Sequence, residues 1–144
     1  MSLMEWGMPK WDGKGVIINA RSESAAVKPT FAKALAERRC VIPSTGFYEW
    51  RQRADTKAKD KFLFNMAEGP MLYMAAIYSE AKDDKPIKER FVILTQNAND
   101  TIRDVHDRMP VILYKNELSR WLTDAGFAAN IFTRDNVELV REAQ

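Results

Sequence analysis

Three apolar runs follow one another in the middle of the chain: Phe62-Leu-Phe-Asn-Met66, Met71-Leu-Tyr-Met-Ala-Ala-Ile-Tyr78 and Phe91-Val-Ile-Leu-Thr95. Their β-branched and aromatic residues favour strands, and the turn-forming groups Glu68-Gly69-Pro70 and Asp83-Asp84-Lys85-Pro86 separate them. Because these strands succeed one another without regular helical crossovers, they argue against a doubly wound α/β sheet. The segment predicts an α+β fold with a mostly antiparallel, barrel-like mixed sheet and a few peripheral helices.

Shorter elements are expected on both sides of this segment. The sequence predicts further strands at Val16–Ile18, Gly46–Trp50 and Val111–Leu113, and at Cys40–Ile42, where Pro43 would end the strand. Helical spacing predicts helices at Thr30–Arg38, with Thr30 near the N-cap, at Thr101–His106 and Glu117–Leu122, and from Thr133 through Val137, Val140 and Arg141. Residues 51–61 are rich in charge and predict a solvated hairpin loop, with a DNA contact as the second interpretation.

The composition is that of an ordinary folded domain with few catalytic groups. The 144 residues suit one domain, and 46% hydrophobic with 29% charged residues argues against a disordered chain. A net charge of +2 excludes a histone-like polycation. One cysteine and one histidine exclude an intrachain disulfide, a Cys-rich zinc site and a multi-His metal centre, so we expect no metal and no cofactor. No apolar stretch reaches the ~18 residues of a membrane span, so we expect a cytoplasmic protein without membrane contacts, nucleoid-associated if bacterial.

The single histidine, His106, and a strand glutamate, Glu49, are the candidate proton-transfer groups. The intrinsic pKa of imidazole suits His106 to proton shuttling, although it can equally be a helix-terminal residue bonded to a carbonyl. Glu49 lies between Tyr48 and Trp50, and alternation places it on the opposite face from both rings. If that face points inward, desolvation raises the pKa of Glu49 and suits it to general acid catalysis. Otherwise Glu49 is exposed and the aromatic rings form the core.

A polar row and two tryptophans are candidates for ligand contacts. Asn19 and Arg21 share one face of an extended segment, with Glu23 in line beyond them. Such a row can present an amide and a guanidinium to a phosphate or carboxylate; alternatively it anchors a loop, with Arg21 paired to Glu23. Trp6 and Trp11 are candidate stacking platforms for bases, or packing residues of the core or edge.

Six ordered blocks of the sequence share the pattern of one known family. They are Ile18-Asn-Ala-Arg-Ser-Glu23, Lys28-Pro-Thr-Phe31, Arg38-Arg-Cys-Val-Ile-Pro43, Gly46-Phe-Tyr-Glu-Trp50, Thr95 through Ala98-Asn99, and His106-Asp-Arg-Met-Pro-Val111. In this order, and preceded by Trp6-Gly-Met-Pro, they resemble a SOS-response-associated peptidase (SRAP) domain. The resemblance spans nearly the whole chain, and only the part from about Lys115 is generic.

The resemblance implies a protein of the DNA damage response that recognises abasic sites in single-stranded DNA. In that family an N-terminal cysteine becomes joined to the damaged sugar. Its α-amine attacks the aldehyde of the opened sugar to give a Schiff base, and its thiol closes onto the imine to give a thiazolidine. The family label of peptidase, a hydrolase, fits autoproteolytic removal of its own leading residues, and its abasic-site chemistry is lyase-like, so the enzyme class stays open.

By the same resemblance, each matching residue acquires an expected role. Asn19 would position the N-terminal amine and thiol, Glu49 would act as general acid and base, and His106 would assist proton transfer. Two arginines would bind the flanking phosphates, a salt-sensitive contribution, and further residues would contact the DNA, chiefly by stacking on bases. These DNA-binding candidates are Arg21, Arg108, Trp11, Trp6, Trp50 and Thr95.

One departure from the family pattern concerns the nucleophile. In the family it precedes the block that corresponds to Trp6-Gly-Met-Pro9 by a substantial stretch, whereas here that block begins at Trp6. Met1-Ser2-Leu3 is interpreted as a cloning remnant, so residues 1–144 are expected to be a single SRAP-like domain without its N-terminal part. Ser2 lacks a thiolate and the internal Cys40 lacks a free α-amine. The alternatives are a non-covalent single-strand-binding module and a thiol peptidase that uses Cys40; the oligomeric state is left open.

Overall fold

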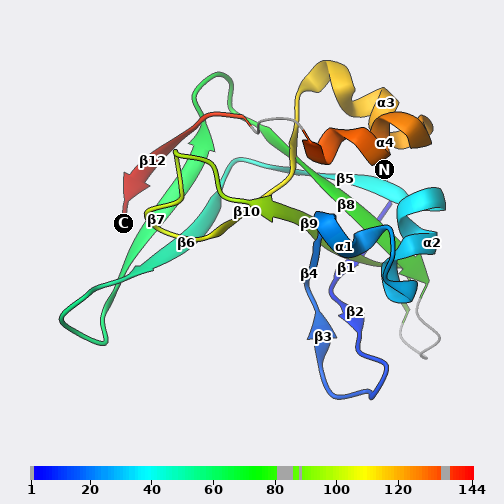
Figure 1. Ribbon diagram of the computed structural model, residues 1–144, viewed down its shortest axis with the longest axis horizontal. Helices are drawn as coiled ribbons and strands as arrows, with labels where there is room; N and C mark the ends of the chain where they lie inside the picture. The colour runs from blue at the N-terminus through cyan, green and yellow to red at the C-terminus, as the bar shows by residue number, and fades with distance from the viewer. Residues whose placement is uncertain (1, 81–85, 88, 134–136) are drawn as a thin grey trace.

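Two long antiparallel strands, β8 (Leu72–Glu80) and β9 (Glu89–Asn97), form the centre of the molecule (Figure 1). The computed structural model describes residues 2–80, 86–87, 89–133 and 137–144. The register of β8 and β9 runs from Glu80 opposite Glu89 to Ala76 opposite Ile93. The turn expected at residues 83–86 falls mostly outside the described residues.

Beyond this paired stretch, a later segment of the chain lies between β8 and β9. The strand β10 (Arg108–Pro110) pairs with β9, and β11 (Ile112–Leu113) pairs with β8. Between them, the Val111 amide donates to the Leu94 carbonyl at 2.9 Å, and the Val111 carbonyl accepts from the Ala75 amide at 2.8 Å. Val111 therefore joins the two long strands where they no longer pair with each other.

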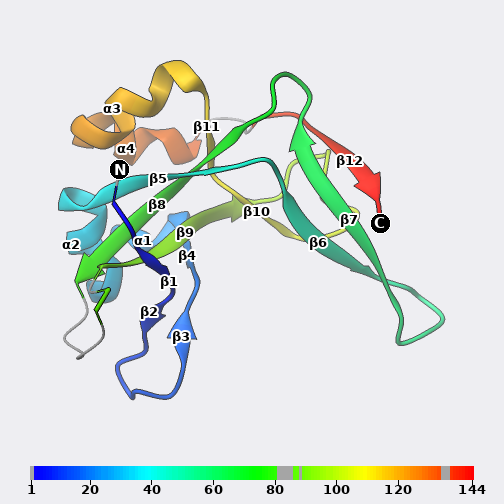
Figure 2. The ribbon, with the colours of Figure 1, turned by 180° about the vertical axis from the view of Figure 1, so that it is seen from behind.

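The outer strands complete a seven-stranded sheet. On the far edge of β8 lies β5 (Arg39–Ser44), which is antiparallel to it. On β9 lie two short parallel strands, β1 (Glu5–Trp6) and β4 (Asn19–Arg21). Between these two strands the chain makes a separate hairpin, β2 (Met8–Pro9) and β3 (Val16–Ile17), which projects from the body of the molecule (Figure 2).

A second sheet is formed by β6 (Phe47–Gln52), β7 (Lys59–Met66) and β12 (Leu139–Ala143), in the order β12-β7-β6. The chain enters it from β5 through Gly46, where any Cβ atom would lie 2.7 Å from the carbonyl oxygen of Phe64. Since that neighbour is backbone, a larger residue at 46 would push β6 away from β7. The glycine therefore allows the tight passage from one sheet to the other.

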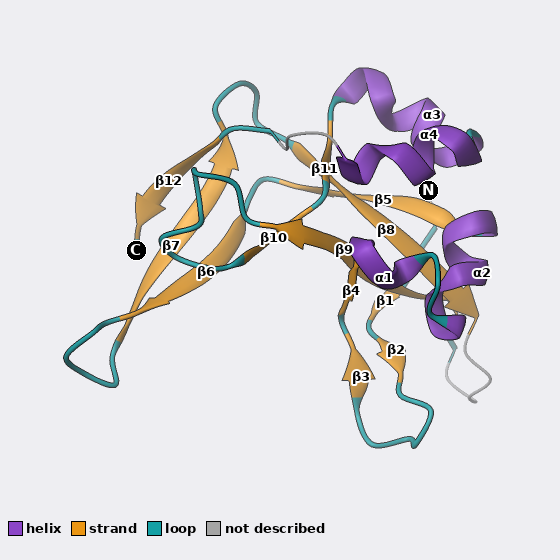
Figure 3. Ribbon diagram, in the orientation of Figure 1, coloured by secondary structure: helices purple, strands orange, loops and turns teal. Residues whose placement is uncertain are grey.

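The helices gather on one face of the seven-stranded sheet (Figure 3). Alternate residues of β8 and β9, such as Ala75, Ile77, Val92 and Leu94, face them in one core cluster. The helices are α1 (Ser22–Ala25), α2 (Pro29–Glu37), α3 (Leu118–Thr123) and α4 (Ala125–Asn130), with 3-10 turns η1 (Lys115–Glu117) and η2 (Ile131–Thr133).

The opposite face of the same sheet packs against β7 and β12. Leu72, Met74 and Ile93 contribute to this second core cluster, together with Phe64 of β7 and Leu139 of β12. The two clusters follow the period-two alternation of a strand, in which neighbouring side chains point to opposite faces. The second cluster leaves a solvent-accessible angle between the two sheets, and the candidate site lies there.

The α+β class and the mostly antiparallel pairing are confirmed, whereas the barrel-like closure is wrong. Across the described residues the two larger sheets stay open and separate. The helix expected from Thr133 is also wrong, because residues 139–143 form β12; residues 134–136 are outside the described part. Val137 and Leu139 are both buried whereas Val140 is 45% exposed, so the segment follows the period-two pattern of a strand and not the helical i, i+3 spacing. The open edge of β7 supplies the backbone partners that favour the strand.

Three local expectations also need correction. The helix α2 begins at Pro29, which occupies its first turn, so Thr30 is not the N-cap. Strand β5 continues through Pro43, which a strand paired on one edge tolerates. The segment expected as a helix from Thr101 consists of hydrogen-bonded turns, in which Asn99 Oδ1 accepts from the Thr101 amide at 3.1 Å.

The core between the two sheets makes a first prediction. Phe64 is fully buried and lies in the cluster that joins β7 to the seven-stranded sheet. Phe64→Ala should lower the free energy of unfolding by about 3–5 kcal/mol, because it removes buried apolar surface and leaves a cavity. Urea unfolding followed by tryptophan fluorescence measures the loss. The exposed-site control Val27→Ala should stay within about 0.5 kcal/mol; equal losses in both variants would contradict this core assignment.

Candidate active site

A cavity of about 350 Å³ lies in the angle between the seven-stranded sheet and the β6–β7–β12 sheet. Its walls come from six strands (β1, β4, β6, β8, β9 and β10) and from His106, in the segment that enters β10. The apolar part of the lining consists of Phe47, Met74, Ile93, Met109 and Pro110. The polar part consists of Asn19, Arg21, Tyr48, Glu49, Thr95, His106 and Arg108, with the Trp6 ring at the edge.

The fold brings together most of the residues that the sequence predicts for the site. Seven of them line this cavity: Trp6, Asn19, Arg21, Glu49, Thr95, His106 and Arg108. Trp50 lies outside it, in an adjoining groove. Trp11 is 99% exposed in the turn of the β2–β3 hairpin and belongs to neither. Their predicted roles in DNA contact stay predictions.

Glu49 points inward from β6. Residues 47, 49 and 51 are partly buried while Tyr48, Trp50 and Gln52 are exposed, so the alternation places the carboxyl on the cavity side. The Glu49 side chain keeps 25% exposure. Burial raises the pKa of this carboxyl above its ordinary value, a repulsion from Asp107 adds to the rise, and His106 together with the Trp50 backbone opposes it. The alternative of an exposed Glu49 opposite an aromatic core is wrong for this strand.

His106 ends the turn that leads into β10. Its amide donates to the Ile102 carbonyl at 3.0 Å, which holds the backbone in a helical turn. The Arg108 amide donates to His106 Nδ1 at 3.0 Å. The Arg108 carbonyl oxygen also lies 3.2 Å from Nδ1, so this atom accepts from the amide in one tautomer and donates to the carbonyl in the other. Asp107 Oδ1 lies 3.3 Å from Nδ1 and would accept from the ring when both nitrogens are protonated.

The Nε2 atom of His106 faces Glu49 across the cavity, with 4.0 Å between Nε2 and Oε2. A carboxyl whose pKa is raised by burial holds a proton more readily than a solvated one. A neutral imidazole has one ring nitrogen that donates and one that accepts. The pair can therefore donate and accept protons at a reacting group bound between them. The separation is longer than a direct hydrogen bond, as is common before a substrate is bound.

Asn19 and Arg21 form the wall opposite this pair. They alternate with the buried Ala20 along β4, so both side chains reach the cavity from the same face. Arg21 is exposed, and the structure gives its guanidinium no ion pair with any described residue. The expected direct Arg21–Glu23 ion pair is therefore absent among the described residues, although the Arg21 charge contributes to lowering the pKa of Glu23. Arg21 is a cation at the rim of the cavity that remains available to an anionic ligand.

Arg108 instead takes the partner expected for Arg21. Its Nη1 and Nη2 donate to the two carboxylate oxygens of Glu23 at 2.6 and 2.9 Å, in a bidentate arrangement. The same guanidinium donates to Asn97 Oδ1 at 2.6 Å and to the Thr95 carbonyl at 2.7 Å. This contact lowers the pKa of Glu23 below its ordinary value. Arg108 thus ties α1 and β9 to β10, and its charge is largely compensated within the protein.

An aromatic groove of about 440 Å³ adjoins the cavity on the β5–β6 side. The Trp6, Tyr48 and Trp50 side chains in it are between 44% and 53% exposed. Trp6 is fixed by its Nε1–H, which donates to the Ile18 carbonyl at 2.9 Å, and by stacking on Phe91 at 6.3 Å. The Lys61 ammonium lies 3.8 Å from the centre of the Tyr48 ring. Exposed, immobilised rings beside a cation suit the flat faces of nucleobases.

Cys40 lies on β5, in a different groove from the cavity. Desolvation, with a smaller repulsion from Glu89, raises the pKa of its thiol to about 12. The thiol is therefore protonated and poorly nucleophilic at neutral pH. Among the residues that the structure describes, no three His, Cys, Asp or Glu side chains gather in a way that would hold a metal ion. Within that same part of the chain, no helix has the length and apolarity of a membrane span.

Some lining residues had no predicted role in the sequence. Tyr48 and Met109 belong to blocks that were singled out, but nothing in their local pattern shows that they face a common cavity. Glu23 stood in the polar row, and only the long-range approach of β10 selects Arg108 as its partner. Asp104, two residues before His106, also lacked a signal: its contacts come from strands that are distant in the sequence.

The buried carboxyl predicts a pH-dependent stability difference. The folded protein binds the Glu49 proton more tightly than the unfolded chain, because the folded pKa is raised. This stabilisation is present below the ordinary pKa and is lost as the pH rises through the folded pKa. Glu49→Gln should therefore gain stability relative to wild type as the pH rises above the ordinary carboxyl pKa of 4.5, measured by urea unfolding. Glu68→Gln, at an exposed turn, controls for loss of a carboxylate; a pH-independent Glu49 difference would contradict the burial effect.

Comparison with known proteins places this geometry in a family. Residues 1–138 match the family model described as SOS response associated peptidase (SRAP). The chain is 35% identical over 126 residues to the abasic site processing protein YoqW of Bacillus subtilis (strain 168), covering 83% of this chain and 55% of that protein. It is 33% identical over 118 residues to the abasic site processing protein YedK of Escherichia coli (strain K12), covering 81% and 52%. The chain thus spans about half the length of these curated relatives.

The structural comparison agrees with the sequence comparison. A crystal structure of a protein from Bacteroides thetaiotaomicron superposes with a TM-score of 0.83 at 27% identity, covering 97% of this chain and 67% of that chain. A second, from Bordetella bronchiseptica, superposes with a TM-score of 0.82 at 28% identity, covering 98% and 75%. With a family model matched over residues 1–138 and the same fold in these structures, the chain belongs to the SRAP family.

Proposed function

We propose that this domain recognises abasic sites in single-stranded DNA and supplies the proton-transfer groups for their covalent capture. The observation that carries the proposal is the facing pair of Glu49 and His106, 4.0 Å apart in a cavity that also presents Asn19 and Arg21. Relatives that share the family are named abasic site processing proteins, which supports the same substrate.

The chemistry of an abasic sugar matches the groups in the cavity. The ring form opens to an aldehyde when a base removes the proton of the anomeric hydroxyl and an acid protonates the ring oxygen. An amine then adds to the aldehyde, and loss of water from the adduct gives an imine, a step that needs an acid at the departing hydroxyl. Glu49, with its raised pKa, serves as that acid, and His106 exchanges protons with the sugar oxygens.

The amine and thiol for this capture come, in the family pattern, from an N-terminal cysteine. Addition of its thiol to the imine carbon transfers the thiol proton to nitrogen and closes a thiazolidine, so no further reagent is consumed. The proposal assigns Asn19, which lines the cavity, to holding the amine. Cys40 does not substitute, because its nitrogen lies within the chain and its buried thiol, with a pKa of about 12, lies in another groove.

The surroundings of the cavity favour a single strand. The aromatic groove beside it offers rings that are roughly half exposed, and bases reach such rings only when they are unstacked from a duplex. Arg21, at the rim, provides a charge-assisted contact for a phosphate next to the lesion. Thr95 and Arg108, which the resemblance also assigns to DNA, hold the wall through their mutual hydrogen bonds.

Binding tests the recognition step without any covalent chemistry. Arg21→Ala should weaken binding of a fluorescent abasic single strand about tenfold, because it removes one charge-assisted phosphate contact. It should also reduce the slope of log K against log salt by about 0.7. Fluorescence anisotropy over a salt series gives both values. Arg120→Ala, on the helical face, should change neither; unaltered binding by Arg21→Ala would remove this residue from the interface.

Adduct formation tests the chemical step. The 144-residue chain should give no covalent adduct with an abasic oligonucleotide, whereas the same chain joined to the Cys-led N-terminal segment of a family relative should give one. In the joined form, Glu49→Gln should slow adduct formation by about 10²–10⁴-fold, the usual loss when a general acid is removed. Denaturing gels over a time course measure the rates. An adduct with the 144-residue chain, or an unchanged rate for Glu49→Gln, would contradict the assignment.

A further inference from the structure

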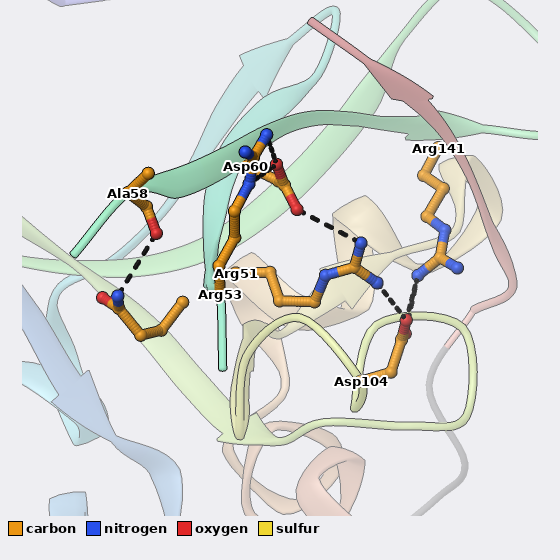
Figure 4. A network of polar contacts seen from close by, with 7 residues as sticks. Arg51, Arg53, Ala58, Asp60, Asp104 and Arg141 are labelled. Atoms are coloured by element: carbon orange, nitrogen blue, oxygen red, sulfur yellow. Dashed lines mark hydrogen bonds and ion pairs between the residues drawn. The ribbon is translucent and has the colours of Figure 1, made fainter. Parts of the chain in front are cut away.

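An ionic network beside the cavity ties the turn that carries His106 to the second sheet (Figure 4). Its centre is Asp104, which lies in the turn two residues before the imidazole. Arg141 Nη1, from β12, donates to both carboxylate oxygens of Asp104 at 2.6 and 2.7 Å. Arg51 Nη1, from β6, lies 3.4 Å from Oδ2 of the same carboxylate. Asp104 thus contacts β12 and β6, two strands that are distant from it in the sequence.

The two arginines are themselves held in place. The guanidinium carbons of Arg51 and Arg141 lie 5.0 and 5.4 Å from the centre of the Phe62 ring. Asp60 binds the other side of Arg51 at 3.4 Å. Planar guanidinium groups fixed by an aromatic face and by carboxylates lose little freedom on binding a further acid. The site for the Asp104 carboxylate is therefore preorganised by the second sheet.

The network runs beside the proton-transfer pair. Arg51 follows Glu49 by two positions on β6, so both side chains point to the same face. Asp104 precedes His106 by two positions in the turn. The Arg51–Asp104 contact therefore links the same two segments as the Glu49–His106 approach. Within the same turn, the ion pair of Asp100 with Arg103 stays internal and links the turn to neither strand.

We propose that Asp104 is a positioning residue, which holds the His106 turn against β6 and thereby sets the distance between the imidazole and the Glu49 carboxyl. The proposal rests on the proposed function, and the structural evidence for it is this ionic network. The side chains of Arg51, Asp104 and Arg141 are each between 40% and 48% exposed. Their contribution to global stability is accordingly small, whereas proton transfer is sensitive to displacements of the order of 1 Å.

The test uses the single histidine of the chain. Because His106 is the only one, its ring signals in an NMR spectrum are unambiguous. In an acid titration of the 144-residue protein without DNA, ionisation of Glu49 should shift the His106 ring signals and give an inflection in their titration curve. Glu49→Gln should abolish this inflection and so assigns it to Glu49. Asp107, which lies beside the His106 ring, and Arg108, whose charge is paired with Glu23, are unchanged in all variants. Asp104→Asn should lose the Glu49 inflection and the contacts between the ring and Glu49 protons, whereas Asp100→Asn should retain both.

Stability and a second variant complete the design. Asp104→Asn should unfold at nearly the wild-type urea concentration. If this variant does not fold, Arg141→Gln serves in its place, because it leaves Asp104 and Arg51 unchanged; it should weaken the Glu49 inflection. Asp104→Glu should restore part of it, because the charge is kept. Retention of the full Glu49 inflection in a folded Asp104→Asn or Arg141→Gln protein would overturn the proposal.

Adduct formation separates this proposal from the proposed function. In the chain joined to the Cys-led segment, Asp104→Asn should lower the rate of adduct formation but leave the affinity for the abasic strand unchanged, while Asp100→Asn should alter neither. If the inflection disappears in Asp104→Asn but the joined wild-type chain forms no adduct, the positioning role stands and the proposed function fails. Normal adduct rates in a variant that has lost the inflection would overturn the role in catalysis.

Discussion

The hydrogen bonds of Val111 to both central strands are the constraint on which the site depends. The strands β8 and β9 pair from Glu80 opposite Glu89 only as far as Ala76 opposite Ile93, and Val111 joins them beyond that point. Peptide groups left unpaired inside a sheet are costly, so a strand is required between them. Because β10 and β11 satisfy those groups, the residues just before β10 emerge at the open end of the sheet. His106 is therefore placed there by backbone hydrogen bonding.

Arg108 extends the same constraint to the wall of the cavity. Its bidentate contact with Glu23 and its bond to the Thr95 carbonyl connect β10 to the start of α1 and to β9. A guanidinium that is only 15% exposed needs such partners, because an unpaired buried charge is strongly unfavourable. Arg21, the last residue of β4, forms no ion pair with a described residue and stays exposed at the rim of the cavity. Arg108 thus supports the cavity wall, whereas Arg21 lies at its rim.

Features governed by neighbouring residues could be predicted from the sequence, and those set by distant partners could not. Period-two alternation correctly placed Glu49 on the opposite face of β6 from Tyr48 and Trp50, although only the folded structure shows that this face points inward. The spacing of Asn19 and Arg21 correctly placed them on one face of an extended segment. The helical spacing used at the C-terminal end failed at residues 139–143, because the open edge of β7, distant in sequence, makes that segment a strand. Asp104 was missed for this reason: its partner Arg141 lies on the strand that was expected to be a helix.

The arrangement of charges explains how Glu49 keeps a raised pKa in a protein that is rich in arginine. Arg51 lies on the same face of β6, and a direct contact with Glu49 would lower the pKa of this carboxyl. Instead Asp60 and Asp104 engage Arg51. The nearby groups that shift the pKa of Glu49 are then Asp107, which raises it, and His106, which lowers it less than burial raises it. Asp104 therefore acts twice, because it ties the His106 turn to the second sheet and, together with Asp60, engages the arginine that shares a strand face with Glu49.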